Sequence, residues 1–164
     1  MAKLYRKPYV ESSVFISLIA DEVTNGIERG RISAKVFSYA ESGDFSIYTS
    51  TLTIAEVYKQ KGNPMGTLTE AQSGQILELF EHEYIKLIDI DRRIAEEAHK
   101  LSRQFGLSPN DAIHLASSLK AKCDILLSWD VNSFISKVQM SEIVVEEPAI
   151  PTKEQLSMLT DSLS

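Results

Sequence analysis

Four acidic residues, Glu11, Glu56, Asp111 and Asp130, stand where the hydrophobic pattern of the chain changes between strand and helix. Glu11 and Asp130 each follow a short apolar run, whereas Glu56 and Asp111 each begin a helical pattern. In a parallel sheet flanked by helices, the strands end and the crossing helices begin at the same edge, where open α/β folds bind ligands. The spacing therefore predicts that the four carboxylates converge on one crevice.

Such a group of carboxylates has a definite chemistry. Like charges within a few Å disfavour joint ionisation, so the carboxylates must bind protons, meet bound cations or stay apart. Mg²⁺ and Mn²⁺ prefer oxygen ligands, and Mg²⁺ combines a few carboxylates with the phosphates of a substrate. The pattern thus indicates a Mg²⁺ or Mn²⁺ site that acts on phosphodiesters.

Each acid also has a purely structural interpretation. Thr53 and Glu56 fit a capping box, Ser108 precedes Asp111 as a serine cap, and Asp130 can cap the turn that follows it. Capping explains why an acid begins a helix. It does not explain why two strands of one sheet also end in acids, so the combination favours a site.

Strand-like and helix-like segments alternate along most of the chain. Strands are expected at 8–10, 45–49, 84–90, 125–128 and 143–145, and helices at 13–20, 33–42, 54–61, 70–83, 92–105 and 109–122, with a short turn at 132–135. This alternation is typical of an α/β fold with a parallel sheet. We expect one domain over 1–147, followed over 148–164 by a linker and a short helical tail. The prolines at the start of this last segment should interrupt regular structure.

Composition narrows the class of protein. The 164 residues are 43% hydrophobic and 24% charged, as in an ordinary globular domain, and the net charge of −6 argues against binding nucleic acid through bulk electrostatics. No apolar run approaches the roughly 20 residues that span a bilayer, and the single cysteine, Cys123, forms no internal disulfide. These features predict a cytoplasmic protein without a membrane segment.

Four segments resemble the acidic motifs of PIN-domain proteins, in the same order and spacing. They are Tyr9-Val-Glu-Ser-Ser-Val-Phe-Ile16, Thr49-Ser-Thr-Leu-Thr-Ile-Ala-Glu-Val57, Ser108-Pro-Asn-Asp-Ala-Ile-His-Leu-Ala116 and Cys123-Asp-Ile-Leu-Leu-Ser-Trp-Asp-Val-Asn-Ser-Phe134. The resemblance covers roughly 7–147. It implies a three-layer α/β fold with a central parallel sheet ordered 3-2-1-4-5 and a metal-dependent endoribonuclease, as in the VapC-type toxins of toxin–antitoxin pairs.

The resemblance also implies roles for individual residues. It assigns the binding of Mg²⁺ or Mn²⁺ to Glu11, Glu56, Asp111 and Asp130, with Ser12 and Asn132 in support. His114 lies three residues after Asp111 and is interpreted either as a contact to substrate or as a histidine packed against the sheet. The implied partners are an RNA substrate and an antitoxin protein.

A homodimer is expected for two reasons. The resemblance implies it, and the apolar residues Val14, Phe15, Leu18 and Ile19 cover more of the first helix than one core-facing stripe needs.

Glu11 is the main departure from the family pattern, which has aspartate at this position. The additional methylene shifts the carboxylate, whereas Mg²⁺ demands near-ideal octahedral geometry. An alternative function is therefore a noncatalytic PIN scaffold that binds RNA or protein. A phosphoacceptor module with an acidic Mg²⁺ pocket is disfavoured, because Lys86 and Lys100 do not follow a late strand.

Overall fold

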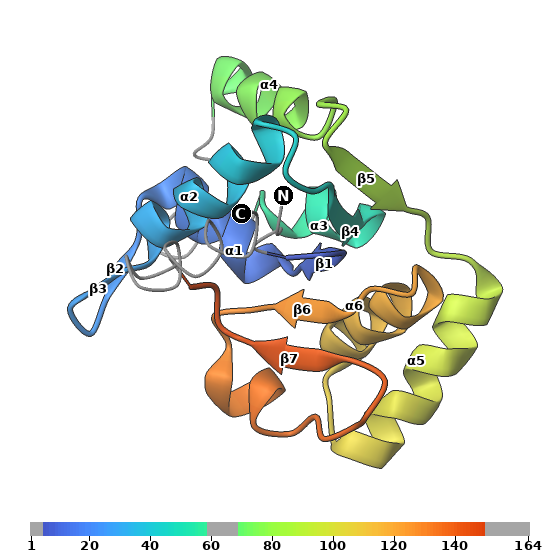
Figure 1. Ribbon diagram of the computed structural model, residues 1–164. Coiled ribbons are helices and arrows are strands. Elements are labelled where there is room, and N and C mark those ends of the chain that lie inside the picture. Colours follow the sequence, from blue (N-terminus) through green and yellow to red (C-terminus); the bar gives the residue numbers. More distant parts are fainter. Residues whose placement is uncertain (1–4, 59–68, 150–164) are drawn as a thin grey trace, which may run out of the picture.

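The computed structural model describes residues 5–58 and 69–149, which form a five-stranded sheet, a small hairpin and helices on both faces of the sheet (Figure 1). The sheet contains β1 (Pro8–Val10), β4 (Ile47–Ser50), β5 (Ile85–Ile88), β6 (Ile125–Leu127) and β7 (Val144–Glu146). Its order is β5-β4-β1-β6-β7, and every neighbouring pair is parallel. Counted within this sheet alone, the order is 3-2-1-4-5, so the predicted α/β fold is confirmed.

The helices lie in two layers. They are α1 (Ser12–Ala20), α2 (Arg29–Glu41), α3 (Thr51–Glu56), α4 (Glu70–Leu79), α5 (Arg92–Phe105) and α6 (Pro109–Lys120), with a π-helical turn, η1 (Val131–Ile135). Figure 1 shows α1, α2 and α4 on one side of the sheet and α5 and α6 on the other.

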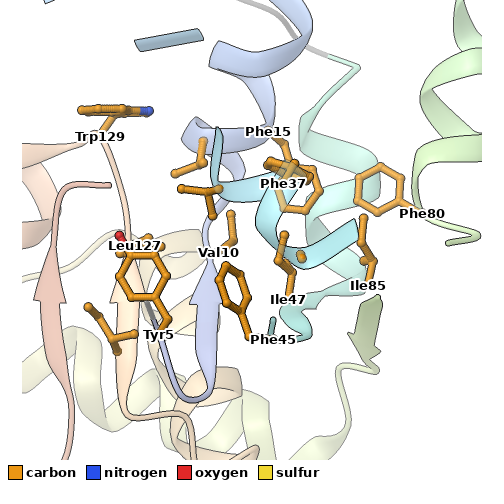
Figure 2. Packing of buried hydrophobic residues seen from close by; sticks show 14 of the residues in the cluster. Tyr5, Val10, Phe15, Phe37, Phe45, Ile47, Phe80, Ile85, Leu127 and Trp129 are labelled. Atoms are coloured by element: carbon orange, nitrogen blue, oxygen red, sulfur yellow. The ribbon is translucent and has the colours of Figure 1, made fainter. Parts of the chain in front are cut away.

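The central strand β1 supplies a residue to the core on each face of the sheet. Val10 packs with Phe15, Phe37 and Ile47 on the α1 and α2 side (Figure 2), whereas its neighbour Tyr9 packs on the α5 and α6 side. Successive residues of a strand point to opposite faces, and both of these side chains are 0% exposed. Because β1 is covered on both faces, Glu11 enters the interior directly after it.

Local signals set the bounds of the α5–α6 pair. Asp91 caps α5 by accepting a hydrogen bond from the Ile94 N–H at 2.9 Å, and Gly106 ends it with a left-handed φ of 68°. Ser108 then caps α6, as predicted. Asp111 consequently lies in the first turn of α6, at the carboxyl edge of the sheet.

The predicted helix over 54–61 is wrong at its start, because α3 begins at Thr51, and positions 59–61 lie outside the described residues. The hydroxyl of Ser50 accepts the Leu52 N–H at 3.1 Å as β4 ends, and Thr53 is buried with its hydroxyl 2.7 Å from that of Thr49. Thr53 therefore does not cap a helix, and Glu56 ends α3 instead of beginning one. The helix has 6 residues and is thus only about 9 Å long, so its last residue remains close to the edge of the sheet.

The hairpin of β2 (Val23–Thr24) and β3 (Ile27–Glu28) was not predicted. Asn25 and Gly26 form its turn with positive φ angles of 52° and 75°, the Asn-Gly pattern of a tight two-residue connection. The hairpin leads directly into α2, which therefore begins before the predicted position 33.

Other differences are confined to the ends of elements. The predicted helices 70–83 and 109–122 end at Leu79 and Lys120, and the last strand is shifted by one residue to Val144–Glu146. Most of the expected tail, over 150–164, lies outside the described residues. Across 5–58 and 69–149, no helix combines the length and apolar character that crossing a membrane requires.

Candidate active site

Glu11 is held by three hydroxyl groups. Its side chain is buried, with 5% of the residue exposed. Oε1 accepts a hydrogen bond from the Ser12 hydroxyl at 2.5 Å, and Oε2 accepts from the hydroxyls of Ser13 at 2.5 Å and Ser128 at 2.8 Å. A carboxylate has about four acceptor positions, so Oε1 retains one for a further ligand.

Glu56 meets two donors from α6. Its Oε2 lies 2.7 Å from Nε2 of His114, and its Oε1 accepts a hydrogen bond from the Asn110 amide at 3.0 Å. Burial alone would raise the pKa of Glu56. The hydrogen bond and charge of His114, together with the effects of Ser12 and Asn110, outweigh burial and hold this pKa below its usual value.

His114 is fully buried, as the packed-histidine interpretation predicted. Its Nδ1 lies 2.7 Å from the Tyr9 hydroxyl, which also accepts a hydrogen bond from the Ser50 N–H at 3.1 Å. Burial lowers the pKa of His114, but the hydrogen bond to Glu56 and the negative charges of Glu11, Glu56 and Asp111 raise it above its ordinary value. The imidazole therefore belongs to the acidic cluster although solvent does not reach it.

Asp111 experiences the charge of the other acids. Burial, followed by the negative charges of Glu11 and Asp130, raises its pKa to about 6, against the opposing effects of Ser108 and His114. A carboxyl group with this pKa is ionised at neutral pH at a cost in free energy. Asp111 therefore lies close enough to Glu11 and Asp130 to experience their charges.

Asp130 caps η1, as its capping interpretation predicted. Its Oδ1 accepts the Ser133 N–H at 3.2 Å, and its Oδ2 accepts from the hydroxyl of the same serine. The preceding residue, Trp129, packs at the margin of the hydrophobic cluster (Figure 2), and its indole N–H donates to the hydroxyls of Ser17 at 3.1 Å and Ser33 at 3.0 Å. This buried indole anchors the backbone that carries Asp130.

The described residues bring together part of the predicted site, with the candidate His114 beside two of its acids. Glu11, Glu56 and His114 each offer one ligand atom, and these atoms lie within 4.8 Å of one another. Asp111 is electrostatically coupled to this group, whereas Asn132 is an exposed residue of η1. The oxygen-rich donor set and its excess negative charge suit a hard divalent cation.

Sequence reasoning placed Ser12 at the site, where its hydroxyl donates to Glu11, but it did not find the distant partners of the two glutamates. Ser128 lies 117 positions from Glu11, and His114 lies 58 positions from Glu56. Ser128 directly follows the apolar run of β6, and this position at the carboxyl edge of the sheet could have indicated that it belongs to the site. Tyr9 gave no such signal, because an aromatic residue in a central strand is ordinary core.

The chain belongs to the PIN-domain family, because residues 9–139 match the family model of the PIN domain. No curated protein matches the sequence significantly. Solved structures with a similar fold include a chain of a toxin–antitoxin complex from Klebsiella pneumoniae (TM-score 0.60, 18% identity, 84% of this chain and 95% of that chain covered). A second is VapC20 of Mycobacterium tuberculosis, described as a sarcin-ricin loop cleaving toxin (TM-score 0.59, 15% identity, 84% and 98% covered). A third belongs to VapBC2 of Rickettsia felis, bound to a DNA fragment from its promoter (TM-score 0.57, 14% identity, 85% and 97% covered).

Proposed function

We propose that this protein is a Mg²⁺- or Mn²⁺-dependent endoribonuclease and the toxin of a VapBC-type toxin–antitoxin pair. The observation that carries the proposal is the acidic cluster, in which carboxylate oxygens of Glu11 and Glu56 lie within 4.8 Å of each other. Burial, together with the negative charges of Glu11 and Asp130, raises the pKa of the nearby Asp111 to about 6. Membership of the PIN-domain family supports the same reaction class.

Glu11, Glu56, Asp111 and Asp130 are the residues that would hold the cation. A bound divalent cation supplies Lewis acidity, lowers the pKa of water and orients a phosphate group. The serine hydroxyls fix Glu11, and His114 and Asn110 fix Glu56, so that two carboxylates are oriented before substrate arrives. Ionised Asp111 adds negative charge at the same place, which increases the attraction for a cation.

The proposed partners follow from the family and from the structural neighbours. RNA is the proposed substrate and an antitoxin the proposed inhibitor, in keeping with neighbours described as toxin–antitoxin complexes and as a toxin that cleaves the sarcin-ricin loop. The proposed location is the cytoplasm, where RNA and the antitoxin are available.

A homodimer remains part of the proposal, with weaker support from α1 than its sequence suggested. Val14 and Phe15 are 0% exposed, and Leu18 and Ile19 pack partly buried against the same hydrophobic cluster. The apolar residues of this helix are thus largely used within the chain. Light scattering at tens of micromolar protein tests the dimer, and a strict monomer contradicts it.

A noncatalytic PIN scaffold is the second candidate function. The three hydroxyls on Glu11 favour it, because they leave this carboxylate with one acceptor position for a cation. The scaffold requires that the protein bind RNA or protein without cleaving RNA.

Cleavage of unstructured RNA in Mg²⁺, Mn²⁺ or a chelator distinguishes the two candidates. The nuclease proposal expects cleavage that depends on the cation and disappears in Asp130→Asn. Cleavage that persists in the chelator or in that variant comes from a contaminant. Absence of cleavage by the pure, folded protein in both ions, with RNA binding retained, supports the scaffold and overturns the nuclease.

A further inference from the structure

A chain of hydrogen bonds leads from the interior of the sheet to Glu56. The Ser50 N–H donates to the Tyr9 hydroxyl at 3.1 Å, that hydroxyl lies 2.7 Å from Nδ1 of His114, and Nε2 of His114 lies 2.7 Å from Oε2 of Glu56. Tyr9 and His114 are both 0% exposed. Both ring nitrogens of the histidine are therefore engaged by protein groups.

The direction of these bonds follows from the groups at the two ends of the chain. An amide N–H can only donate, so the Tyr9 oxygen accepts from Ser50, and the Tyr9 O–H remains able to donate to Nδ1 of His114. The Glu56 carboxylate can only accept, so its 2.7 Å contact with His114 requires a proton on Nε2. A neutral imidazole that accepts at Nδ1 carries its proton on Nε2, which then donates to Glu56. A charged imidazole also carries a proton on Nε2. In both cases Nε2 presents a proton and no free lone pair to Glu56.

We propose that His114 and Tyr9 are positioning residues that orient the carboxylate of Glu56, and that His114 does not bind the cation. The distances alone allow the opposite interpretation, because a ring nitrogen of His114 lies within 4.8 Å of carboxylate oxygens of Glu11 and Glu56. If Nε2 bound the cation, it would lose the proton that it donates to Glu56, and the 2.7 Å hydrogen bond would break.

Glu56 needs such support because of its place in the chain. It is the last residue of a helix of 6 residues, so α3 alone restrains its side chain little. The inference rests on the proposed function for its cation measurements. The hydrogen bonds themselves can be tested without any cation.

The first experiment is ¹⁵N NMR of the histidine side chains in the cation-free protein, with His114 assigned by comparison with His114→Gln. Wild type should show a protonated Nε2 at His114, and Glu56→Gln should shift that resonance. Tyr9→Phe removes the donor to Nδ1 and should change the Nδ1 resonance. A His114 ring with a bare Nε2, insensitive to Glu56→Gln, overturns the proposal.

The second experiment measures the affinities of Mg²⁺ and Mn²⁺ by calorimetry. Glutamine at position 114 retains an N–H for Glu56 and an oxygen for Tyr9, whereas alanine retains neither. Loss of a group that orients a ligand costs about 10- to 100-fold in metal affinity. His114→Ala should therefore weaken the binding of both ions by about this factor and by equal amounts. The affinities of His114→Gln should stay within about threefold of wild type.

A ligand role for His114 predicts a different pattern. Imidazole favours transition metals over Mg²⁺, so His114→Gln would lose as much affinity as His114→Ala, and more for Mn²⁺ than for Mg²⁺. His99→Ala, at an exposed position of α5, is the matched control. If His114→Ala fails to fold, His114→Gln and Tyr9→Phe carry the comparison. If wild type binds neither ion, the proposed function fails, and the NMR result still decides whether His114 holds Glu56.

Discussion

The two glutamates and the two aspartates of the acidic site are held in different ways. Glu11 is buried among the hydroxyls of its neighbours Ser12 and Ser13 and of the distant Ser128. Glu56 is partly exposed but is paired with buried His114, so each glutamate accepts a hydrogen bond from a distant part of the chain. Asp111 and Asp130 are partly exposed and lie at the starts of α6 and η1. Hydrogen bonds from other side chains thus fix the positions of the glutamates. The aspartates are placed by the starts of their helices, and their charge is available to a cation.

This difference separates carboxylates that stabilise the fold from carboxylates that serve the proposed reaction. A carboxylate that satisfies buried donors contributes to stability, because its removal leaves those donors without partners. Asp111, a partly exposed carboxylate with a raised pKa, reduces stability until a proton or cation meets it. Substitutions should therefore affect stability mainly at the glutamates, and cation-dependent cleavage mainly at the aspartates.

The largest expected effect is on RNA cleavage by Asp111→Asn. Loss of this charge should lower the rate at least about 100-fold, or about 2.8 kcal/mol in the barrier, because the asparagine amide attracts a cation less strongly. Single-turnover cleavage in Mg²⁺ and Mn²⁺ measures the change. Asp89→Asn, at an exposed position after β5, is the matched control and should cleave like wild type. Retention of full activity by Asp111→Asn would remove this residue from the site.

The next effect concerns stability and is expected for Glu11→Asp. A carboxylate withdrawn by one methylene loses contact with two or more of the hydroxyls of Ser12, Ser13 and Ser128, each worth about 1 kcal/mol. Urea denaturation should show a loss of about 2 kcal/mol. Glu96→Asp, in a surface ion pair on α5, should change stability by less than about 0.5 kcal/mol.

Cleavage by the same variant tests how Glu11 is accommodated. If the hydroxyls have adapted the site to glutamate, both Glu11→Asp and Glu11→Gln should lower activity. If Glu11 instead holds its carboxylate too far forward, Glu11→Asp should raise cleavage and Glu11→Gln should lower it. A rise would show that the serine hydroxyls do not define the working position of this carboxylate.

The smallest effect is a gain in stability of the cation-free protein in Asp111→Asn. The pKa of Asp111 is raised from 3.8 to about 6, so the folded state binds more protons than the unfolded state between these values. Stability contributed by this group is therefore present below about pH 4 and is lost as the pH rises to about 6.

At neutral pH the variant should gain about 1 kcal/mol, since solvent screening of this partly exposed carboxyl reduces the roughly 3 kcal/mol that the full shift would represent. Denaturation of both proteins in a chelator between about pH 4 and pH 8 measures the difference. The gain should vanish near pH 4. A constant difference across this range would show that the ionisation of Asp111 does not cause it.

The sequence by itself determined the elements whose signals are local. The bounds of α5 follow from Asp91 and Gly106, the start of α6 follows from Ser108, and the alternation of strands and helices indicates the parallel sheet. Hydrogen bonds of this kind join residues a few positions apart, so short-range patterns report them. Short-range patterns likewise place Glu11 directly after β1 and Asp111 at the start of α6.

Only the tertiary structure decided how the glutamates are held and where α3 begins. The Thr49 hydroxyl that meets Thr53 also contacts the Val10 carbonyl of the neighbouring strand across 39 positions. Ser128 reaches Glu11 across 117 positions, and His114 reaches Glu56 across 58. These contacts depend on which strands are neighbours and on their register. A shift of one residue in a strand turns every side chain to the opposite face, so no local pattern could have assigned these partners.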